Sequence, residues 1–460
     1  MEKNIFSLIA KLDIYTQNRL KKWLQSPIHT QDKNLFLLVE TFLQQLKKKK
    51  SVNEAVDLLK NEASYDTVSA LAKRVREFLA YEYWQQNAVQ TNFALAENLY
   101  HLKLETHTDD ALKRTTDALE KQPHRNADWH FYYYQMLCLY EITQQNEVRK
   151  TGKTAVLDIV NHLDIAYFVK RLTLYADIIS YNNVLKLNLK NEGYAALVAY
   201  ISALGMLHEP LIALHIALLN CLIDEENEAH FYTLKTLLTA HYALLNAYER
   251  RDRSMVAINY CVRRINKGFM HYYKELFDLY LVLLGNKVLL ENDVLQYWDY
   301  KNIISVGLQV KEYDWIARFL YEYNEKIPAN WRENALTYNL AKINFAQKNY
   351  PKVIELLQIV EYQDIVYTLD SRTMLLRTYY ETTEFDAFDT AAESFRIFLL
   401  RNKTISLNMK KMYQNFLRFI KILASVAFKD KKSILKLKED IEKCDAVADK
   451  KWLLENKIFS

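Results

Sequence analysis

Glycine and proline are almost absent from this chain, which contains only 6 Gly and 5 Pro among its 460 residues. Average proteins contain roughly 7% glycine and 5% proline, so few positions here favour a left-handed backbone conformation or interrupt a helix. Strands joined by tight turns and phosphate-binding loops should therefore be scarce. The chain also lacks a Pro/Gly/Ser-rich linker of the kind that separates independent domains, which predicts a single elongated helical array.

Apolar residues recur at helical spacing along most of the chain. Between Asp314 and Lys326 they lie three and four positions apart and share one helix face: Trp315, Ile316, Phe319, Leu320 and Tyr323. Short polar breaks such as Gln347 to Asn349 separate one such stretch from the next. Helices this short cannot bury an apolar face alone, so we expect an all-α fold of antiparallel helix pairs that stack on one another.

Three aromatic residues mark an internal period. Tyr313, Tyr350 and Phe385 are 37 and 35 positions apart, and each would open the second helix of a pair. The pattern resembles the tetratricopeptide repeat, whose unit is 34 residues. In the register of that family the resemblance implies interior positions at Ile303, Leu340, Leu375, Ile304, Ala341 and Leu376 on the first helices, and at Ile316, Val353, Phe388, Leu320, Leu357, Ala392, Tyr323, Val360 and Phe395 on the second helices. The resemblance implies a right-handed superhelical α-solenoid of antiparallel helix pairs.

The resemblance covers residues 300–400 and fails at the small residues that let helices approach closely. Bulky side chains replace them, so we expect wider helix spacing: Ile304, Leu376, Ile316, Val353 and Phe388. Four segments are predicted: an N-terminal helical bundle (1–90), a divergent helix-pair solenoid (91–300), tetratricopeptide-like repeats (301–400) and a basic C-terminal helical cap (401–460), whose last helix spans 446–458. The first segment also resembles the opening of uncharacterised bacterial helical-repeat proteins.

In the tetratricopeptide family the inner helices face a concave groove. The resemblance places seven residues of this chain there: Lys301, Leu308, Tyr338, Lys342, Phe345, Arg377 and Tyr380. The set combines cations with aromatic rings. Such a groove would suit an extended acidic peptide, because the cations pair with carboxylates and the rings pack against its side chains. An ordinary amphipathic helix face would carry the same residues, so both interpretations stay open.

Positive charge gathers at the C-terminal end, where residues 401–460 carry 15 Lys or Arg against 7 Asp or Glu. Such an end could attract an acidic protein or a nucleic acid at long range. A solvated, lysine-rich terminal helix would have the same composition.

Residue patterns for catalysis or cofactor binding are missing from the sequence. The glycines stand apart and form no phosphate loop, the histidines form no HExxH motif, and the four cysteines form no CxxC pair. No apolar stretch reaches the roughly 18 to 20 residues of a membrane span, and the first residues do not have the pattern of a secretory signal. We therefore expect a cytoplasmic, non-enzymatic protein-interaction scaffold that binds a protein or peptide partner, with no cofactor, no metal and no membrane contact.

An alternative function comes from the N-terminal segment. Two predicted helices, Val52 to Leu59 and Thr67 to Leu79, flank a break at residues 61–65 and outline a helix-turn-helix. The second helix carries three cations: Lys73, Arg74 and Arg76. Acidic residues nearby oppose a phosphate backbone: Glu62, Asp66 and Glu77. The alternative is a regulator that couples this nucleic-acid-binding head to a solenoid sensor, although an ordinary helix pair would show the same outline.

Overall fold

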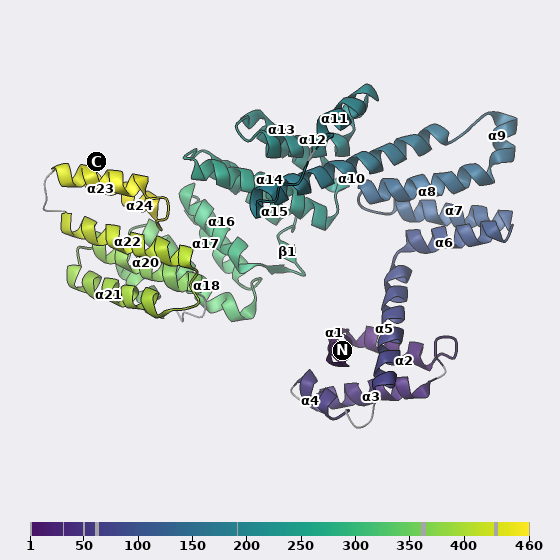
Figure 1. Ribbon diagram of the computed structural model, residues 1–460, viewed down its shortest axis with the longest axis horizontal. Helices are drawn as coiled ribbons and strands as arrows, with labels where there is room; N and C mark the ends of the chain where they lie inside the picture. The colour runs from purple at the N-terminus through teal and green to yellow at the C-terminus, as the bar shows by residue number, and fades with distance from the viewer. Residues whose placement is uncertain are drawn as a thin grey trace. The chain divides into compact units, whose positions relative to one another are not determined.

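The computed structural model describes residues 2–30, 32–48, 51–59, 64–190, 192–359, 365–426 and 431–459 (Figure 1). These residues form 24 α-helices, four 3-10 helices and one two-stranded hairpin, so the expected all-α class is confirmed. The chain divides into two compact units. The first unit comprises Met1–Leu219 and Ala240–Asn246, and the second comprises Asn220–Thr239 and Ala247–Ser460. The four segments expected from the sequence remain a prediction.

The first unit opens with a bundle of five helices: α1 (Glu2–Lys11), α2 (Ile14–Gln25), α3 (Lys33–Lys48), α4 (Val52–Asp57) and α5 (Tyr65–Gln86). Their apolar faces meet in one core, which includes the fully buried Ile9, Val39 and Phe42. Polar caps set the helix starts: the Asp13 side chain, for example, accepts hydrogen bonds from two N–H groups of the first turn of α2. Residues 61 to 63 of the predicted break, Glu62 among them, lie outside the described residues.

The remainder of the first unit is also built from helices. They are α6 (Ala88–His101), α7 (Glu105–Glu120), α8 (Ala127–Thr143), α9 (Gln145–Thr151), α10 (Val156–Leu185), α11 (Tyr194–Ala203), η1 (Met206–His208), most of α12 (Pro210–Ile223) and η2 (Tyr242–Leu244). Helix α6 packs on α7, and α8 packs on α10.

The second unit contains the rest of the secondary structure. Its elements are α13 (Glu228–His241), α14 (Ala247–Asn266), α15 (Tyr272–Gly285), β1 (Leu290–Glu291), β2 (Val294–Leu295), α16 (Tyr297–Gln309), α17 (Tyr313–Asn324), η3 (Ala329–Trp331), α18 (Arg332–Ala346), α19 (Tyr350–Ile359), α20 (Ile365–Glu381), α21 (Phe385–Arg401), α22 (Leu407–Val426), α23 (Lys431–Lys443), α24 (Lys450–Leu454) and η4 (Lys457–Phe459). Consecutive helices pack as pairs from α14 and α15 to α22 and α23, and α18 also contacts both α16 and α20.

The predicted helix starts in residues 300–400 coincide with the observed ones. Helices α17, α19 and α21 begin at Tyr313, Tyr350 and Phe385, the aromatic residues that the sequence pattern placed there. Many predicted interior positions are fully buried, including Ile303 and Val353. Val360, another of these positions, lies outside the described residues.

The turns before these three helices share one backbone geometry. A residue two positions before each aromatic is left-handed: Lys311 (φ 63°), Lys348 (φ 61°) and Thr383 (φ 60°). The next N–H in each turn bonds back to the preceding helix, as in Asn349 N to Asn344 O at 2.8 Å. Glycine usually occupies this position because a Cβ crowds the backbone there. The expectation that scarce glycine leaves few left-handed turns is therefore wrong, since lysine and threonine adopt the conformation here.

The strain at these turns leads to a stability prediction. Lys348→Gly is expected to raise the free energy of unfolding by about 1 kcal/mol, because glycine adopts this φ without Cβ crowding. Lys436→Gly is the matched control, since Lys436 is exposed within α23 and glycine there should lower stability by about 1 kcal/mol. Urea unfolding of both variants checks the signs. A loss of stability in Lys348→Gly would contradict the assignment of strain.

One glycine does permit close helix approach. A Cβ added to Gly307 in α16 would lie 2.8 Å from Ile316 Cγ1 in α17 and 3.3 Å from Phe277 Cε2 in α15. The backbone of α16 therefore contacts its neighbours where only hydrogen fits. The bulk of Ile304 and Ile316 predicted wider spacing, but Gly307 supplies the missing small residue three positions after Ile304.

The hairpin and the C-terminus complete the fold. Strands β1 and β2 pair antiparallel around Asn292 and Asp293, which are both left-handed. The helix expected over residues 446–458 is instead the five-residue α24 followed by η4, and it is preceded by the left-handed Asp449. In the described part of the chain, no helix combines the length and the apolar character that crossing a membrane requires.

Candidate functional site

A cavity of about 410 Å³ lies in the second unit, between the inner faces of α16, α18 and α20 and the C-terminal residues. Five of the seven residues predicted to face a groove line it: Leu308, Tyr338, Lys342, Phe345 and Arg377. The sequence places them together because Tyr338, Lys342 and Phe345 are three and four positions apart on α18, and so share one face of that helix. Five of the predicted residues thus meet at one partly open cavity.

Asp370 is the acidic centre of the cavity wall. Its carboxylate forms an ion pair with Lys301 and accepts hydrogen bonds from the Tyr413 hydroxyl at 2.9 Å and the Tyr338 hydroxyl at 3.4 Å. Burial, followed by the charge of Asp370, raises the pKa of both tyrosines, so their hydroxyls stay protonated and donate. Lys301 lies behind this carboxylate and is not one of the lining residues.

Lys342 brings an ammonium group to the cavity. The side chain is half-buried, and Nζ donates a hydrogen bond to Ser305 Oγ at 2.5 Å. Burial is the main cause that lowers the pKa of Lys342 to about 8, and the nearby Lys301 charge adds to it, while Asp370 and Asp449 act in the opposite direction. The amine is therefore mostly charged at pH 7 but more weakly so than a surface lysine.

Arg377 is held between two aromatic rings. Its guanidinium carbon lies 4.3 Å from the Phe345 ring centre and 5.0 Å from that of Trp452. Nη1 donates to Asp449 Oδ2 at 2.9 Å. Nε is buried and has no acceptor among the described residues. Arginine offers five N–H donors, and the single hydrogen bond to Asp449 uses one of them.

Tyr380, the last predicted groove residue, lies beyond Arg377 and does not line the cavity. Its hydroxyl donates to Asn456 Oδ1 at 3.2 Å, and its ring packs edge-on against Trp452 with centres 5.6 Å apart. The C-terminal residues therefore cover this part of the inner face.

Among the residues that the sequence reasoning missed are Asp370, Asp449 and Trp452, which contact predicted residues of the site. Asp370 could have been found, because it lies two helical turns before Arg377 on α20 and so shares its face. Asp449 and Trp452 had no such signal. They reach Arg377 from a segment more than 70 residues further along the chain, and helical periodicity does not report contacts of that kind.

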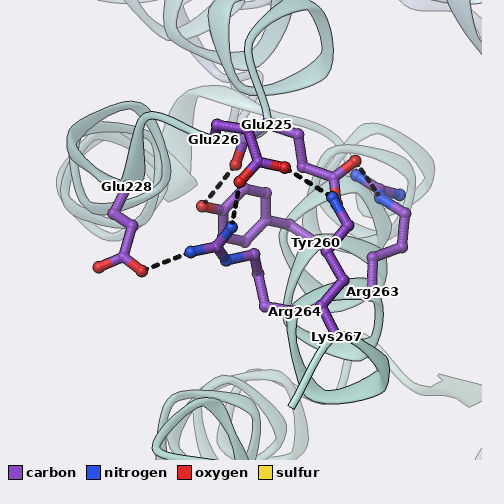
Figure 2. Close-up of polar contacts among 7 residues, drawn as sticks. All are labelled: Glu225, Glu226, Glu228, Tyr260, Arg263, Arg264 and Lys267. Carbon is purple, nitrogen blue, oxygen red and sulfur yellow. Dashed lines mark hydrogen bonds and ion pairs between the residues drawn. The ribbon is translucent and has the colours of Figure 1, made fainter. Parts of the chain in front are cut away.

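A second polar cluster joins the loop before α13 to α14, and Figure 2 shows it. Arg264, whose side chain is only 4% exposed, binds Glu226 at 2.9 Å and Glu228 at 2.7 Å. Lys267 also binds Glu226, at 2.7 Å, and the Tyr260 hydroxyl donates to the Glu225 carbonyl at 3.1 Å. Each cation here already has carboxylate partners. The cluster is therefore best explained as a set of ion pairs that stabilises the packing of the loop before α13 against α14.

Two histidines form a close pair in the first unit. The Nδ1 atoms of His130 in α8 and His162 in α10 are 2.9 Å apart. Burial, together with the charge of His162, lowers the pKa of His130 to about 4, so the pair is neutral at pH 7. The described residues contain no group of three or more His, Cys, Asp or Glu side chains placed to hold a metal ion.

The predicted basic helix of the N-terminal head lies within α5. Arg74 forms an ion pair with Glu77 at 2.6 Å, whereas Lys73 and Arg76 are exposed. One of the three cations is thus neutralised by its own helix.

Comparison of this chain with known protein families, with curated proteins and with solved structures found no match. The function must therefore be argued from the residues of the cavity.

Proposed function

We propose that this chain is a cytoplasmic, non-enzymatic scaffold with a tetratricopeptide-like solenoid, and that the cavity of its second unit binds an acidic segment of a partner protein. The observation that carries the proposal is the convergence of Lys342 and Arg377 with the Phe345 ring on one cavity wall. Partly buried cations of this kind form charge-assisted hydrogen bonds with carboxylates.

The charge of the site favours an anionic ligand. Around the cavity, the cations Lys301, Lys342 and Arg377 face the two carboxylates Asp370 and Asp449. One positive charge therefore remains, and it favours an anionic ligand. A volume of about 410 Å³ lies within the range of binding pockets, near its lower end, and suits one or two side chains of a peptide.

The cysteines agree with the proposed compartment. All four thiols, Cys138, Cys221, Cys261 and Cys444, are free, and free thiols are usual in reducing compartments such as the cytoplasm. The alternative nucleic-acid head is not proposed, because Glu77 already pairs with one of its three cations.

Peptide selection on the immobilised full chain tests the proposal. We expect a library of short random peptides with a fixed Asp to be retained, and the same library with Asn in its place to be lost. The Lys342→Glu/Arg377→Glu variant should reduce retention by about tenfold or more, because two cations that contact the ligand become repulsive.

The matched control is Lys432→Glu/Lys436→Glu, which makes the same change of charge at exposed positions of α23. This variant should bind like the unaltered chain. Equal losses in the two variants would show that only the overall basic character attracts the peptides, and unchanged retention in the cavity variant would overturn the proposal. Circular dichroism and thermal melting establish that each variant is folded.

A further inference from the structure

The C-terminal residues of the chain already place an acid on the cavity and an aromatic ring against Arg377. Asp449 binds Arg377 at 2.9 Å, and Trp452, three positions later, packs against Arg377 and Tyr380. The guanidinium of Arg377 thus lies between the Phe345 ring of the chain's inner face and the Trp452 ring of its terminus. These contacts are the ones that the proposed function assigns to a partner.

Asp449 adopts an unusual backbone conformation to make its contact. Its φ is 50°, in the left-handed region that costs most residues about 1 kcal/mol or more. The residues on either side are firmly held, since Leu453 is fully buried and the Ala448 N–H donates to Met412 O at 3.2 Å. The segment therefore stays attached to the unit while Asp449 lines the cavity and Trp452 packs against Arg377.

The contact between Asp449 and Arg377 is weak enough to exchange. The two side chains are 40% and 18% exposed, and partly exposed ion pairs of this kind contribute about 0 to 1 kcal/mol. Trp452 is only half-buried. A segment that brought both a carboxylate and a ring would compete with both contacts, whereas a carboxylate alone would replace only one.

We propose that Asp449 and Trp452 act as an internal ligand of the cavity, and that the partner segment carries the same pair, an acidic residue followed three positions later by an aromatic residue. The inference rests on the proposed function and specifies the partner that the cavity selects. The internal pair then competes with the partner and sets a lower limit on the affinity that a partner needs.

Fluorescence anisotropy on the full chain tests the inference. The probe is a short labelled peptide of Ala, Ser and Lys with one Asp and, three positions later, one Trp. We expect it to bind the Asp449→Asn/Trp452→Ala chain about fivefold more tightly than the unaltered chain, because removal of a competing contact of about 1 kcal/mol changes affinity by roughly that factor.

Two controls accompany this experiment. Asp445→Asn removes a charge from an exposed residue of the same segment and should leave the affinity unchanged. A second peptide keeps Asp and replaces Trp with Ala. It should bind the Asp449→Asn/Trp452→Ala chain about tenfold more weakly than the first peptide does.

The outcomes separate the two proposals. If both peptides bind the Asp449→Asn/Trp452→Ala chain equally well, the inference is overturned while the proposed recognition of an acidic residue by the cavity stands. If neither peptide binds the Asp449→Asn/Trp452→Ala chain, the inference is also overturned. The proposed function is then tested only by the retention of the random peptide library with a fixed Asp. Thermal melting of the Asp449→Asn/Trp452→Ala chain shows whether it is folded, and Asp449→Asn alone, which preserves side-chain size, should show a smaller gain in affinity if the larger variant has lost stability.

Discussion

Replacing Lys342 with methionine is expected to raise the free energy of unfolding at pH 7 by about 2 kcal/mol. The pKa of Lys342 falls to about 8 in the folded chain, against roughly 10.4 for a free lysine. One pKa unit corresponds to about 1.4 kcal/mol, and partial exposure of the side chain reduces the full effect. Methionine has a similar shape and carries no charge to desolvate.

The pH dependence of this gain has a definite sign. Because burial lowers the pKa of Lys342, the cost of its charge is fully present below about pH 8. The cost shrinks as the pH rises towards 10, where the unfolded lysine also loses its proton. Urea unfolding at pH 7 and pH 9.5 should therefore show a gain at the lower pH that falls by about half at the higher pH.

Lys326→Met serves as the control for this prediction. Lys326 binds Asp293 at 2.6 Å on the surface, and its pKa is raised mainly by that hydrogen bond. Its replacement should bring no gain at either pH. A Lys342→Met chain less stable than the unaltered one at pH 7 would contradict the argument. The same variant should bind acidic peptides more weakly, so that Lys342 would improve binding while it lowers stability.

Gly307→Val is expected to lower the free energy of unfolding by about 2 kcal/mol. The valine Cβ would lie 2.8 Å from Ile316 Cγ1, and its methyl groups would enter the space between α16, α17 and α15. Overpacking of a closed interface typically costs about 1 to 3 kcal/mol because side chains leave their rotamers or helices move apart. Thermal melting or urea unfolding measures the loss.

Gly285→Val provides the comparison. Gly285 is the last residue of α15, and an added Cβ there would meet no atom within 4 Å. The same change of residue type should leave stability nearly unchanged at this exposed position. Equal losses at the two glycines would show that helix propensity, and not the contact with Ile316, decides the outcome.

Much of the fold could be predicted from local patterns. Apolar spacing predicted helices, and three aromatic residues predicted where α17, α19 and α21 begin. The turns were predicted less well. A left-handed turn is recognised in a sequence by its glycine, and here lysine and threonine adopt φ values near 60° instead. The last helix was predicted too long. Left-handed Asp449 breaks the regular backbone at a position where its sequence gives no warning.

The candidate site was predicted on one side only. Positions three, four and seven apart on α18 and α20 share a face, so the register brought Lys342, Phe345 and Arg377 to one wall. The opposite side depends on the C-terminal segment, where Asp449 and Asn456 meet residues more than 70 positions earlier. Only the folded chain shows that Asp449 joins the predicted residues in lining the cavity.

The division of the chain into units has a consequence for work with fragments. Residues 240–246 belong to the first unit, although 220–239 and the chain from 247 onward belong to the second. The Arg125 N–H donates to Leu244 O at 3.0 Å and ties this short stretch to the first unit. A fragment that ends at Leu219 would leave that donor without its acceptor, and an uninterrupted piece of sequence that contains all of one unit also contains residues of the other.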